Sequence, residues 1–112
     1  MLLHDSHTTV DQLKNIMAQF VAERSWQRFH NAKNLSMSLA IEAGELMEHF
    51  QWLTTDETVC GSGFDIKSVG EELADVVCYA LSLANALEID LSSTIGAKME
   101  KNRQKYPAAA DS

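Results

Sequence analysis

The sequence predicts an all-α protein, a helical bundle of about four helices that is completed by association of identical chains. Apolar residues recur at helical spacing in four stretches, and residues suited to N-caps open three of them. No segment shows the sustained alternation of apolar and polar residues that is typical of a strand. A chain of 112 residues is one domain. Such a domain buries only about 60–65% of its unfolded surface, so oligomerisation would add stability.

The first helix is expected to begin after Thr9, because Thr9 and Gln12 have the spacing of a capping box. Its apolar side continues to Val21, and the helix should end near Arg24 or Ser25. The chain is then expected to divide into a flexible N-terminus, a helical domain and a flexible C-terminus, at residues 1–8, 9–107 and 108–112.

The segment from Trp26 to Asn34 lacks clean helical periodicity and combines two aromatic residues, a histidine and two cations. It is too polar for a core and too aromatic for a loop without a role. Loops held by rigid elements are where binding groups concentrate. We therefore expect this segment to face a ligand.

The second helix, expected over residues 32–53, carries two carboxylates on one face. Glu42 and Glu45 are three residues apart, so they lie side by side next to the apolar side of the helix. Neighbouring carboxylates repel each other, and a divalent cation that prefers oxygen ligands would remove this repulsion. The following residues, 54–63, are polar and contain glycine, so we expect a surface loop there.

The third helix repeats this arrangement. It is expected to begin near Asp65 or Ser68 and to run to Leu87, and its carboxylates Glu72 and Asp75 are again three residues apart. If two antiparallel helices bring the pairs together, four carboxylates converge, which predicts a metal site. The alternative is that each pair belongs to the solvated face of an amphipathic helix.

The fourth helix is expected to begin after Asp90, an N-cap residue, and to end before Pro107, because proline cannot continue a helix. It carries basic and polar side chains in an otherwise acidic protein. Cations near a helix C-terminus can simply complement its dipole, but opposite an acidic metal site they would suit a polyphosphate. These residues are Lys98, Lys101, Asn102, Arg103 and Lys105.

Charge and composition exclude several classes of protein. The net charge is −7 and the isoelectric point is about 4.9, and no basic stripe is present that could bind the phosphates of a nucleic acid. Cys60 and Cys78 have no CxxC spacing, so we interpret both as reduced thiols of a cytoplasmic protein, Cys78 as a small core residue. The N-terminus lacks the pattern of a signal peptide, and no stretch approaches the roughly 20 apolar residues of a membrane span.

Several motifs occur in order, nearly without gaps, over about residues 9–107. They are Trp26-x-x-Phe29-His30, Lys33-Asn34-Leu35, Glu42-Ala43-Gly44-Glu45-Leu46, Phe50-Gln51-Trp52, Glu71-Glu72-Leu73-Ala74-Asp75-Val76 and Lys98-Met99-x-x-Asn102-Arg103-x-x-Tyr106-Pro107. Together they resemble the MazG-type all-α nucleoside triphosphate pyrophosphohydrolases, in particular the short, single-domain branch typified by dCTP pyrophosphatase.

The resemblance implies a hydrolase that splits a (deoxy)nucleoside triphosphate into the monophosphate and pyrophosphate, for control or cleaning of the nucleotide pool. It also implies dependence on Mg²⁺, with Mn²⁺ as an alternative ion, and a homo-oligomer that is usually a tetramer. The implied metal ligands are Glu42, Glu45, Glu72 and Asp75. Catalysis, including the general base, is expected of Glu42 and Glu45. Contacts to the base and sugar are expected from Trp26, His30, Trp52 and Tyr79. Contacts to the phosphates, from the same or a neighbouring subunit, are expected from Lys98, Asn102, Arg103 and Tyr106.

Two other classes of function stay open. A non-catalytic binding module would grip nucleotides without releasing pyrophosphate, and the set of four carboxylates argues against it. A structural oligomerisation domain would not respond to Mg²⁺, and the aromatic and basic residues argue against it, although core packing is an alternative role for any single aromatic residue. The sequence departs from the family pattern at Met17 and Ala32, so dCTP is favoured by resemblance only.

Overall fold

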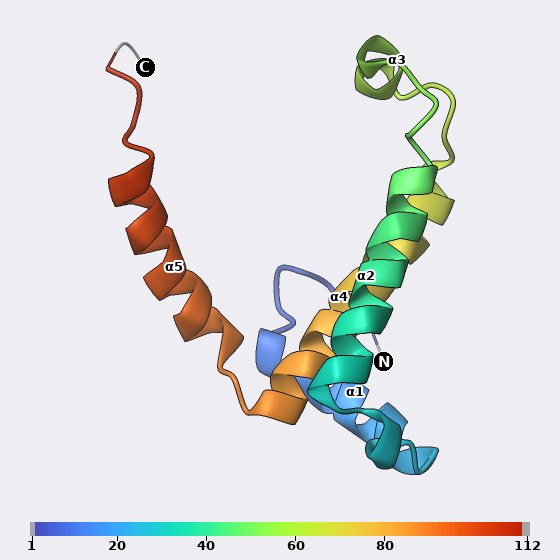
Figure 1. Ribbon diagram of the computed structural model, residues 1–112, viewed down its shortest axis with the longest axis vertical. Coiled ribbons are helices and arrows are strands. Elements are labelled where there is room, and N and C mark those ends of the chain that lie inside the picture. The colour runs from blue at the N-terminus through green and yellow to red at the C-terminus, as the bar shows by residue number, and fades with distance from the viewer. Residues whose placement is uncertain (1, 111–112) are drawn as a thin grey trace.

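A computed structural model describes residues 2–110 of the chain, and within this range it contains helices and no strand (Figure 1). The all-α prediction is therefore confirmed. The elements, in chain order, are α1 (Val10–Glu23), the short 3-10 helix η1 (Gln27–Phe29), α2 (Ala32–Glu48), α3 (Thr55–Cys60), α4 (Ile66–Leu87) and α5 (Leu91–Lys105).

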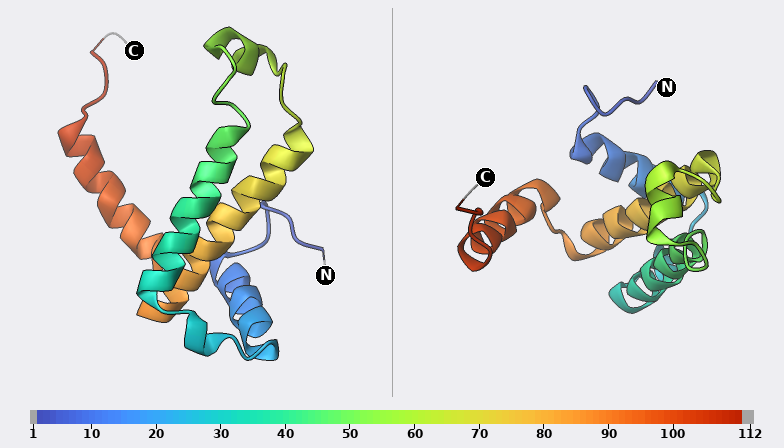
Figure 2. Two further views of the ribbon diagram at one scale, coloured as in Figure 1. Left: turned by 45° about the vertical axis from the view of Figure 1, so that its right-hand side comes forward. Right: turned by 90° about the horizontal axis from the view of Figure 1, so that it is seen from above.

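The centre of the structure is an antiparallel hairpin of α2 and α4, which lie side by side in every view (Figures 1 and 2). Helix α1 packs against α4 near the end of the hairpin where α2 begins. The buried apolar side chains gather at this end, because they come from the last turns of α1 and α4 and the first turn of α2. They are Val21, Leu35, Leu81 and Ala84.

Three helix starts follow the predicted capping chemistry. Thr9 and Gln12 form the expected reciprocal capping box, with Gln12 N donating to Thr9 Oγ1 at 3.1 Å and Thr9 N donating to Gln12 Oε1 at 2.7 Å. Asp65, and not Ser68, is the N-cap of α4, because its carboxylate accepts bonds from both the backbone and the hydroxyl of Ser68. Asp90 caps α5, which ends at Lys105, ahead of the proline as predicted.

The second helix is shorter than predicted. It ends at Glu48 and not at residue 53, because from His49 the chain tightens into turns in which backbone amides bond to the carbonyl three residues earlier. The ring of Phe50 packs edge-on against Phe64, with centroids 5.0 Å apart, and this contact ties the turn to the start of α4. The turn thus includes a tertiary contact that the helical periodicity does not reveal.

The predicted surface loop over residues 54–63 is wrong in part, because it contains helix α3. Thr54 Oγ1 accepts the Glu57 amide at 3.2 Å, and the Glu57 carboxylate accepts the Thr54 amide at 3.0 Å, which is a complete capping box. Gly61 ends the helix in the left-handed conformation, with φ 77°. The stretch is polar because a helix of six residues at the tip of the hairpin buries little.

Helix α5 stands apart from the hairpin (Figures 1 and 2). Among the described residues, it makes no packing contact comparable to those of α1 or α2 with α4. Its direction is set at the turn after α4, where Glu88 adopts a left-handed conformation and the Lys14 ammonium donates to the Ile89 carbonyl at 2.8 Å. Asn85 Nδ2 donates in return to the Lys14 carbonyl at 2.9 Å.

The structure is open for a chain of this size. Its radius of gyration is 17.1 Å, whereas about 13 Å is typical of a compact domain of this length. Its accessible surface is 8730 Å², about 2,600 Å² more than a compact monomer of this mass exposes. Large apolar side chains on this surface include Ile41, Met47, Trp52, Val59, Ile66 and Ile95.

Short segments precede the first helix and follow the last one. Residues 5–7 form an exposed turn, which is closed by a bond from Thr8 N to the His4 carbonyl at 2.9 Å. The predicted flexibility of residues 1–8 and 108–112 stays a prediction, and residues 1, 111 and 112 lie outside the described range. Within that range no single helix has the length and apolar character needed to cross a membrane. Only α4 and α5 taken together, bent by 103°, meet these criteria.

Candidate functional site

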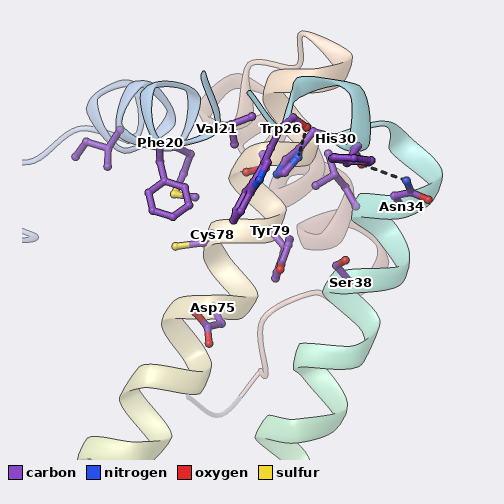
Figure 3. A pocket seen from close by; sticks show the side chains of 14 residues that line it. Phe20, Val21, Trp26, His30, Asn34, Ser38, Asp75, Cys78 and Tyr79 are labelled. Atoms are coloured by element: carbon purple, nitrogen blue, oxygen red, sulfur yellow. Dashed lines mark hydrogen bonds between the residues drawn. The ribbon is translucent and has the colours of Figure 1, made fainter. Parts of the chain in front are cut away.

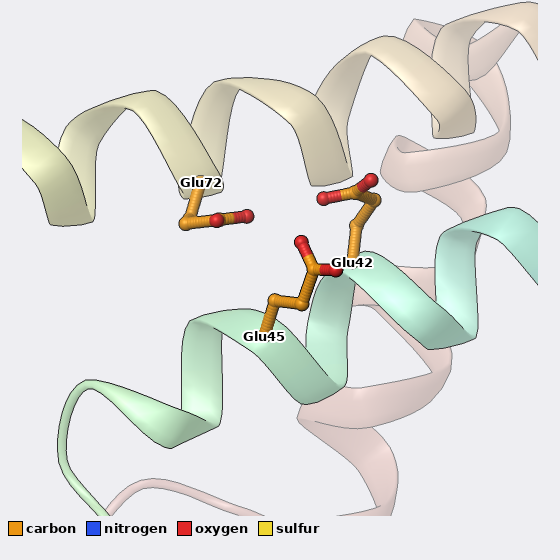
Figure 4. A group of neighbouring side chains, drawn as sticks. All are labelled: Glu42, Glu45 and Glu72. Atoms are coloured by element: carbon orange, nitrogen blue, oxygen red, sulfur yellow. The ribbon is translucent and has the colours of Figure 1, made fainter.

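Three carboxylates meet between the two helices of the hairpin. Glu42 and Glu45 project from α2, Glu72 projects from α4, and one oxygen of each lies within 4.8 Å of the others. Figure 4 shows the three side chains pointing toward one another across the gap between the helices. The spacing of three residues places the α2 pair on one face, and the antiparallel packing brings the α4 carboxylate opposite it.

Electrostatics at this cluster disfavour three separate negative charges. Burial, followed by the neighbouring carboxylates of Glu45, Glu72 and Asp75, raises the pKa of Glu42 from 4.5 to about 7. One buried oxygen of Glu42 and one of Glu72 have no hydrogen-bond partner among the described residues. Buried polar atoms without partners are costly. A positively charged partner would remove this cost and would also reduce the repulsion between the carboxylates.

A divalent cation fits this donor set. The three side chains offer only oxygen ligands, which is what hard cations such as Mg²⁺ and Ca²⁺ prefer. A cation at the centre would partner the two unsatisfied oxygens and remove the repulsion between the carboxylates. The sequence prediction of a metal site thus has a matching geometry in three of its four residues.

The fourth predicted ligand, Asp75, lies outside this group of three. It is exposed, it follows Glu72 by one turn of α4, and it lines a pocket. Its charge acts on both the cluster and the pocket. Burial is the main cause of the raised pKa of Glu42 and of the Cys78 thiol, and the charge of Asp75 raises both pKa values further. Asp75 therefore connects the carboxylate cluster with the pocket.

The pocket has a volume of about 590 Å³ and lies between α1, η1 and the two hairpin helices (Figure 3). One wall is aromatic and apolar, and the other carries polar side chains from α2 and α4. The residues that line it are Ile16, Met17, Phe20, Val21, Trp26, Phe29, His30, Asn34, Leu35, Ser38, Asp75, Cys78, Tyr79 and Ser82.

The aromatic wall is built by the segment that the sequence marks as ligand-facing. The rings of Trp26 and His30 are nearly parallel, at 15°, with centroids 6.5 Å apart, and His30 Nδ1 donates to the Trp26 carbonyl at 3.1 Å. Phe20 meets the Trp26 ring edge-on at 5.8 Å. Asn34 Nδ2 donates to the Phe29 carbonyl at 3.2 Å, which joins the segment to α2. Flat rings held in this way suit a flat ligand.

The remaining predicted site residues are not all at this pocket. Tyr79 lines it, together with Trp26 and His30. Trp52, in the turn after α2, is 87% exposed and does not line it. The four residues predicted to bind phosphates lie on or just after α5, apart from the hairpin of the same chain (Figure 1). They are Lys98, Asn102, Arg103 and Tyr106.

Sequence reasoning missed two hydroxyls and misplaced a thiol. Ser38 and Ser82 line the pocket, and Cys78 faces it instead of being enclosed in the core. Helical spacing could have found Ser38, because it precedes Glu42 by four residues and therefore lies on the same face of α2. Ser82, which is 5% exposed, could have been found in the same way, because it follows Tyr79 by three residues on α4.

Comparisons with known proteins show the family of the chain. The MazG-like family model matches residues 37–112. The chain is 39% identical over 102 residues to dCTP pyrophosphatase 1 from Homo sapiens, an alignment that covers 89% of this chain and 60% of that protein. The corresponding protein from Bos taurus is 36% identical over 104 residues, with 91% and 62% covered. The chain therefore spans less than two thirds of the length of these relatives.

A solved structure resembles nearly the whole chain. The crystal structure of a pyrophosphatase from Archaeoglobus fulgidus is similar with a TM-score of 0.83 and 38% sequence identity, over 96% of this chain and all of that one. Since the family model matches more than half of the sequence, the chain belongs to the MazG-like family.

Proposed function

We propose that the chain hydrolyses a (deoxy)nucleoside triphosphate to the monophosphate and pyrophosphate. The observation that carries this proposal is the continuity of the pocket with the carboxylate cluster through Asp75. A flat base fits the aromatic end, and the phosphates would then extend toward the carboxylates. The names of the relatives, dCTP pyrophosphatase and pyrophosphatase, support the same reaction class.

The negative charges of the substrate and of the carboxylate cluster are the reason that the proposal includes a cation. A nucleoside triphosphate brings up to four negative charges, by its chemistry, to a cluster that is itself acidic, so binding would be repulsive without cations. We propose that Glu42, Glu45 and Glu72 bind Mg²⁺, with Mn²⁺ as an alternative. Asp75 would be the fourth ligand. When bound, such an ion polarises phosphoryl oxygens and the attacking water. Glu42 or Glu45 would accept the proton of that water.

The preferred substrate is proposed to be dCTP or a related deoxynucleotide. This choice rests on the names of the relatives and not on the pocket, because stacking on an aromatic ring tolerates any base. A non-catalytic nucleotide-binding module would use the same pocket. The unpaired carboxylate oxygens favour the enzyme, because simple binding does not need a buried acidic cluster.

We also propose that the active form is a homo-oligomer. About 2,600 Å² of surface in excess of a compact monomer is comparable to the area that obligate subunit interfaces bury, roughly 2,000 Å² or more. The apolar side chains on that surface suit a second copy of the chain. In such an assembly, the basic residues of α5 would approach the pocket of a neighbouring subunit. Light scattering should give a multiple of the monomer mass of 12.4 kDa, and a monomer at micromolar concentration would contradict this proposal.

The reaction is tested by measuring pyrophosphate release from all deoxynucleoside and ribonucleoside triphosphates, with Mg²⁺ and with EDTA. We expect Mg²⁺-dependent release, fastest with dCTP or a close relative. Glu45→Gln should abolish release, because it removes a charge from the cation site, while the protein stays folded. Glu48→Gln is the matched control, since Glu48 is exposed at the end of the same helix.

Two results would contradict the proposal. Nucleotides that raise the melting temperature without any release of pyrophosphate would favour the binding module. Wild-type release by Glu45→Gln would mean that the carboxylate cluster is not the metal site.

A further inference from the structure

Ser38 occupies a distinctive position on the polar wall of the pocket. It lies on α2, four residues before Glu42, and Figure 3 shows it facing Tyr79 of α4 across the pocket. Four residues correspond to one helical turn, about 6 Å along the axis. Tyr79 likewise follows Asp75 by four residues. The two side chains therefore face each other one turn away from the carboxylates, between the cluster and the aromatic wall.

The hydroxyl of Ser38 is free to bind a ligand. Among the described residues, no hydrogen-bond partner of this hydroxyl is found, although the side chain is half-buried. Its neighbours on α2 are engaged: Asn34 Nδ2 donates to the Phe29 carbonyl at 3.2 Å, and Ser36 Oγ donates to the Lys33 carbonyl at 2.9 Å. Between the carboxylates and the aromatic wall, Ser38 is therefore the side chain of α2 that can still both donate and accept a hydrogen bond.

The order of groups along the pocket determines what Ser38 would meet. If the proposed function is right, the phosphates lie at the carboxylates and the base lies against Trp26, so the sugar occupies the level between them. We infer that Ser38 binds the 3′-hydroxyl of the substrate sugar and is a specificity-determining residue of this site. This inference rests on the proposed function for the direction of the nucleotide. Tyr79 would flank the sugar from the opposite side.

A pair of substrates isolates this contact. The kcat/KM of the unsubstituted protein and of Ser38→Ala is measured with dCTP and with 2′,3′-dideoxy-CTP, which lacks the 3′-hydroxyl. We expect Ser38→Ala to lose about fivefold with dCTP, the usual effect of one neutral hydrogen bond. With the dideoxy substrate the partner is already missing, so the substitution should change kcat/KM by less than about twofold, as in a double-mutant cycle.

Ser36→Ala is the matched control. It removes a hydroxyl from the same helix, but Ser36 is exposed and does not line the pocket. It should leave kcat/KM for both substrates unchanged. Equal losses with dCTP and the dideoxy substrate in Ser38→Ala would show that Ser38 acts on something other than the 3′-hydroxyl and would overturn the inference.

A binding measurement separates this inference from the reaction itself. The monophosphates dCMP and 2′,3′-dideoxy-CMP keep the sugar and base but need no turnover, and their Kd values are obtained by calorimetry. A fivefold weaker Kd for dCMP in Ser38→Ala, with no change for the dideoxy compound, supports the inference even if no pyrophosphate is released, in which case the proposed function alone fails. Equal Kd values of dCMP for both proteins, or no dCMP binding at all, would overturn it.

Discussion

At the scale of single residues, the most informative group is the carboxyl of Glu42. Its pKa of about 7 results from burial first and then from the carboxylates around it. A pKa raised in this way is typical of functional sites. It also makes the stability of the metal-free protein depend on pH in an unusual direction for a carboxyl group.

We predict that metal-free protein loses stability as the pH rises from about 4.5 to about 7. In this window the folded state holds a proton on Glu42 that the unfolded state has released, so the free energy of unfolding falls as the pH rises. Glu42→Gln has no proton to lose. Urea denaturation in EDTA measures the free energy of unfolding of both proteins at pH 5 and pH 8. The stability of the variant relative to the unsubstituted protein should be higher at pH 8 than at pH 5. Equal pH dependence of the two proteins would contradict the raised pKa.

A second prediction at this scale concerns the aromatic wall. Trp26 is held by Phe20 and His30, and its ring would stack on the base. Trp26→Ala should weaken nucleotide binding by roughly 1–3 kcal/mol, the range for one stacked base. Trp26→Phe, which keeps a ring, should lose much less. Calorimetry with dCMP measures both, and a Kd unchanged in Trp26→Ala would place the base elsewhere.

At the scale of elements, α3 shows how a short polar segment becomes a helix. Its six residues begin with a full capping box and end with a left-handed glycine, while none of its side chains is buried. Isolated helices of this length are unstable in water. The caps and the connections to α2 and α4 must therefore supply the stability of α3.

Thr54→Ala should selectively loosen α3. Loss of an N-cap hydroxyl costs about 1 kcal/mol, so the amides of α3 should exchange with solvent about fivefold faster, whereas those of the buried end of α4 should be unaffected. Thr55→Ala is the control, because the hydroxyl of Thr55 makes no capping bond, only its carbonyl accepting a bond from Thr58. Hydrogen exchange followed by mass spectrometry distinguishes the two variants, and equal protection in both would assign α3 another source of stability.

At the scale of the whole molecule, the separation of α5 from the hairpin is the main feature. Its basic side chains lie apart from the pocket of the same chain in the arrangement described, since α5 makes no packing contact comparable to those of α1 or α2 with α4. Arg103 instead pairs with Glu100 of the same helix at 3.1 Å, an exposed pair of little energetic value. A neighbouring subunit would provide a surface on which α5 can pack. It would also place a carboxylate cluster near the basic side chains of α5.

Mixed oligomers test this prediction. Glu45→Gln and Arg103→Ala should each be nearly inactive alone, the first through loss of the proposed cation site and the second through loss of the proposed phosphate contact. If each active site combines the carboxylates of one chain with α5 of another, co-expression of the two variants should restore part of the pyrophosphate release. Each variant expressed alone is the control. No recovery in confirmed mixed oligomers would mean that α5 serves its own chain.

The sequence by itself determined the helical fold and the starts of three helices. Helical periodicity and side-chain caps are local, so the starts of α1, α4 and α5 could be predicted from Thr9, Asp65 and Asp90. The spacing of Glu42 and Glu45 likewise placed both carboxylates on one face before their partner was known.

Only the tertiary structure decided which of these groups meet. It brought Glu72 into the cluster and set Asp75 at the edge of the pocket, because the register of α4 against α2 depends on packing between distant residues. It ended α2 at Glu48, before a turn in which Phe50 contacts Phe64, and it separated α5 from the hairpin. Spacing along one helix is local, whereas register, bends and the direction of a helix after a turn are set by long-range contacts that no local pattern contains.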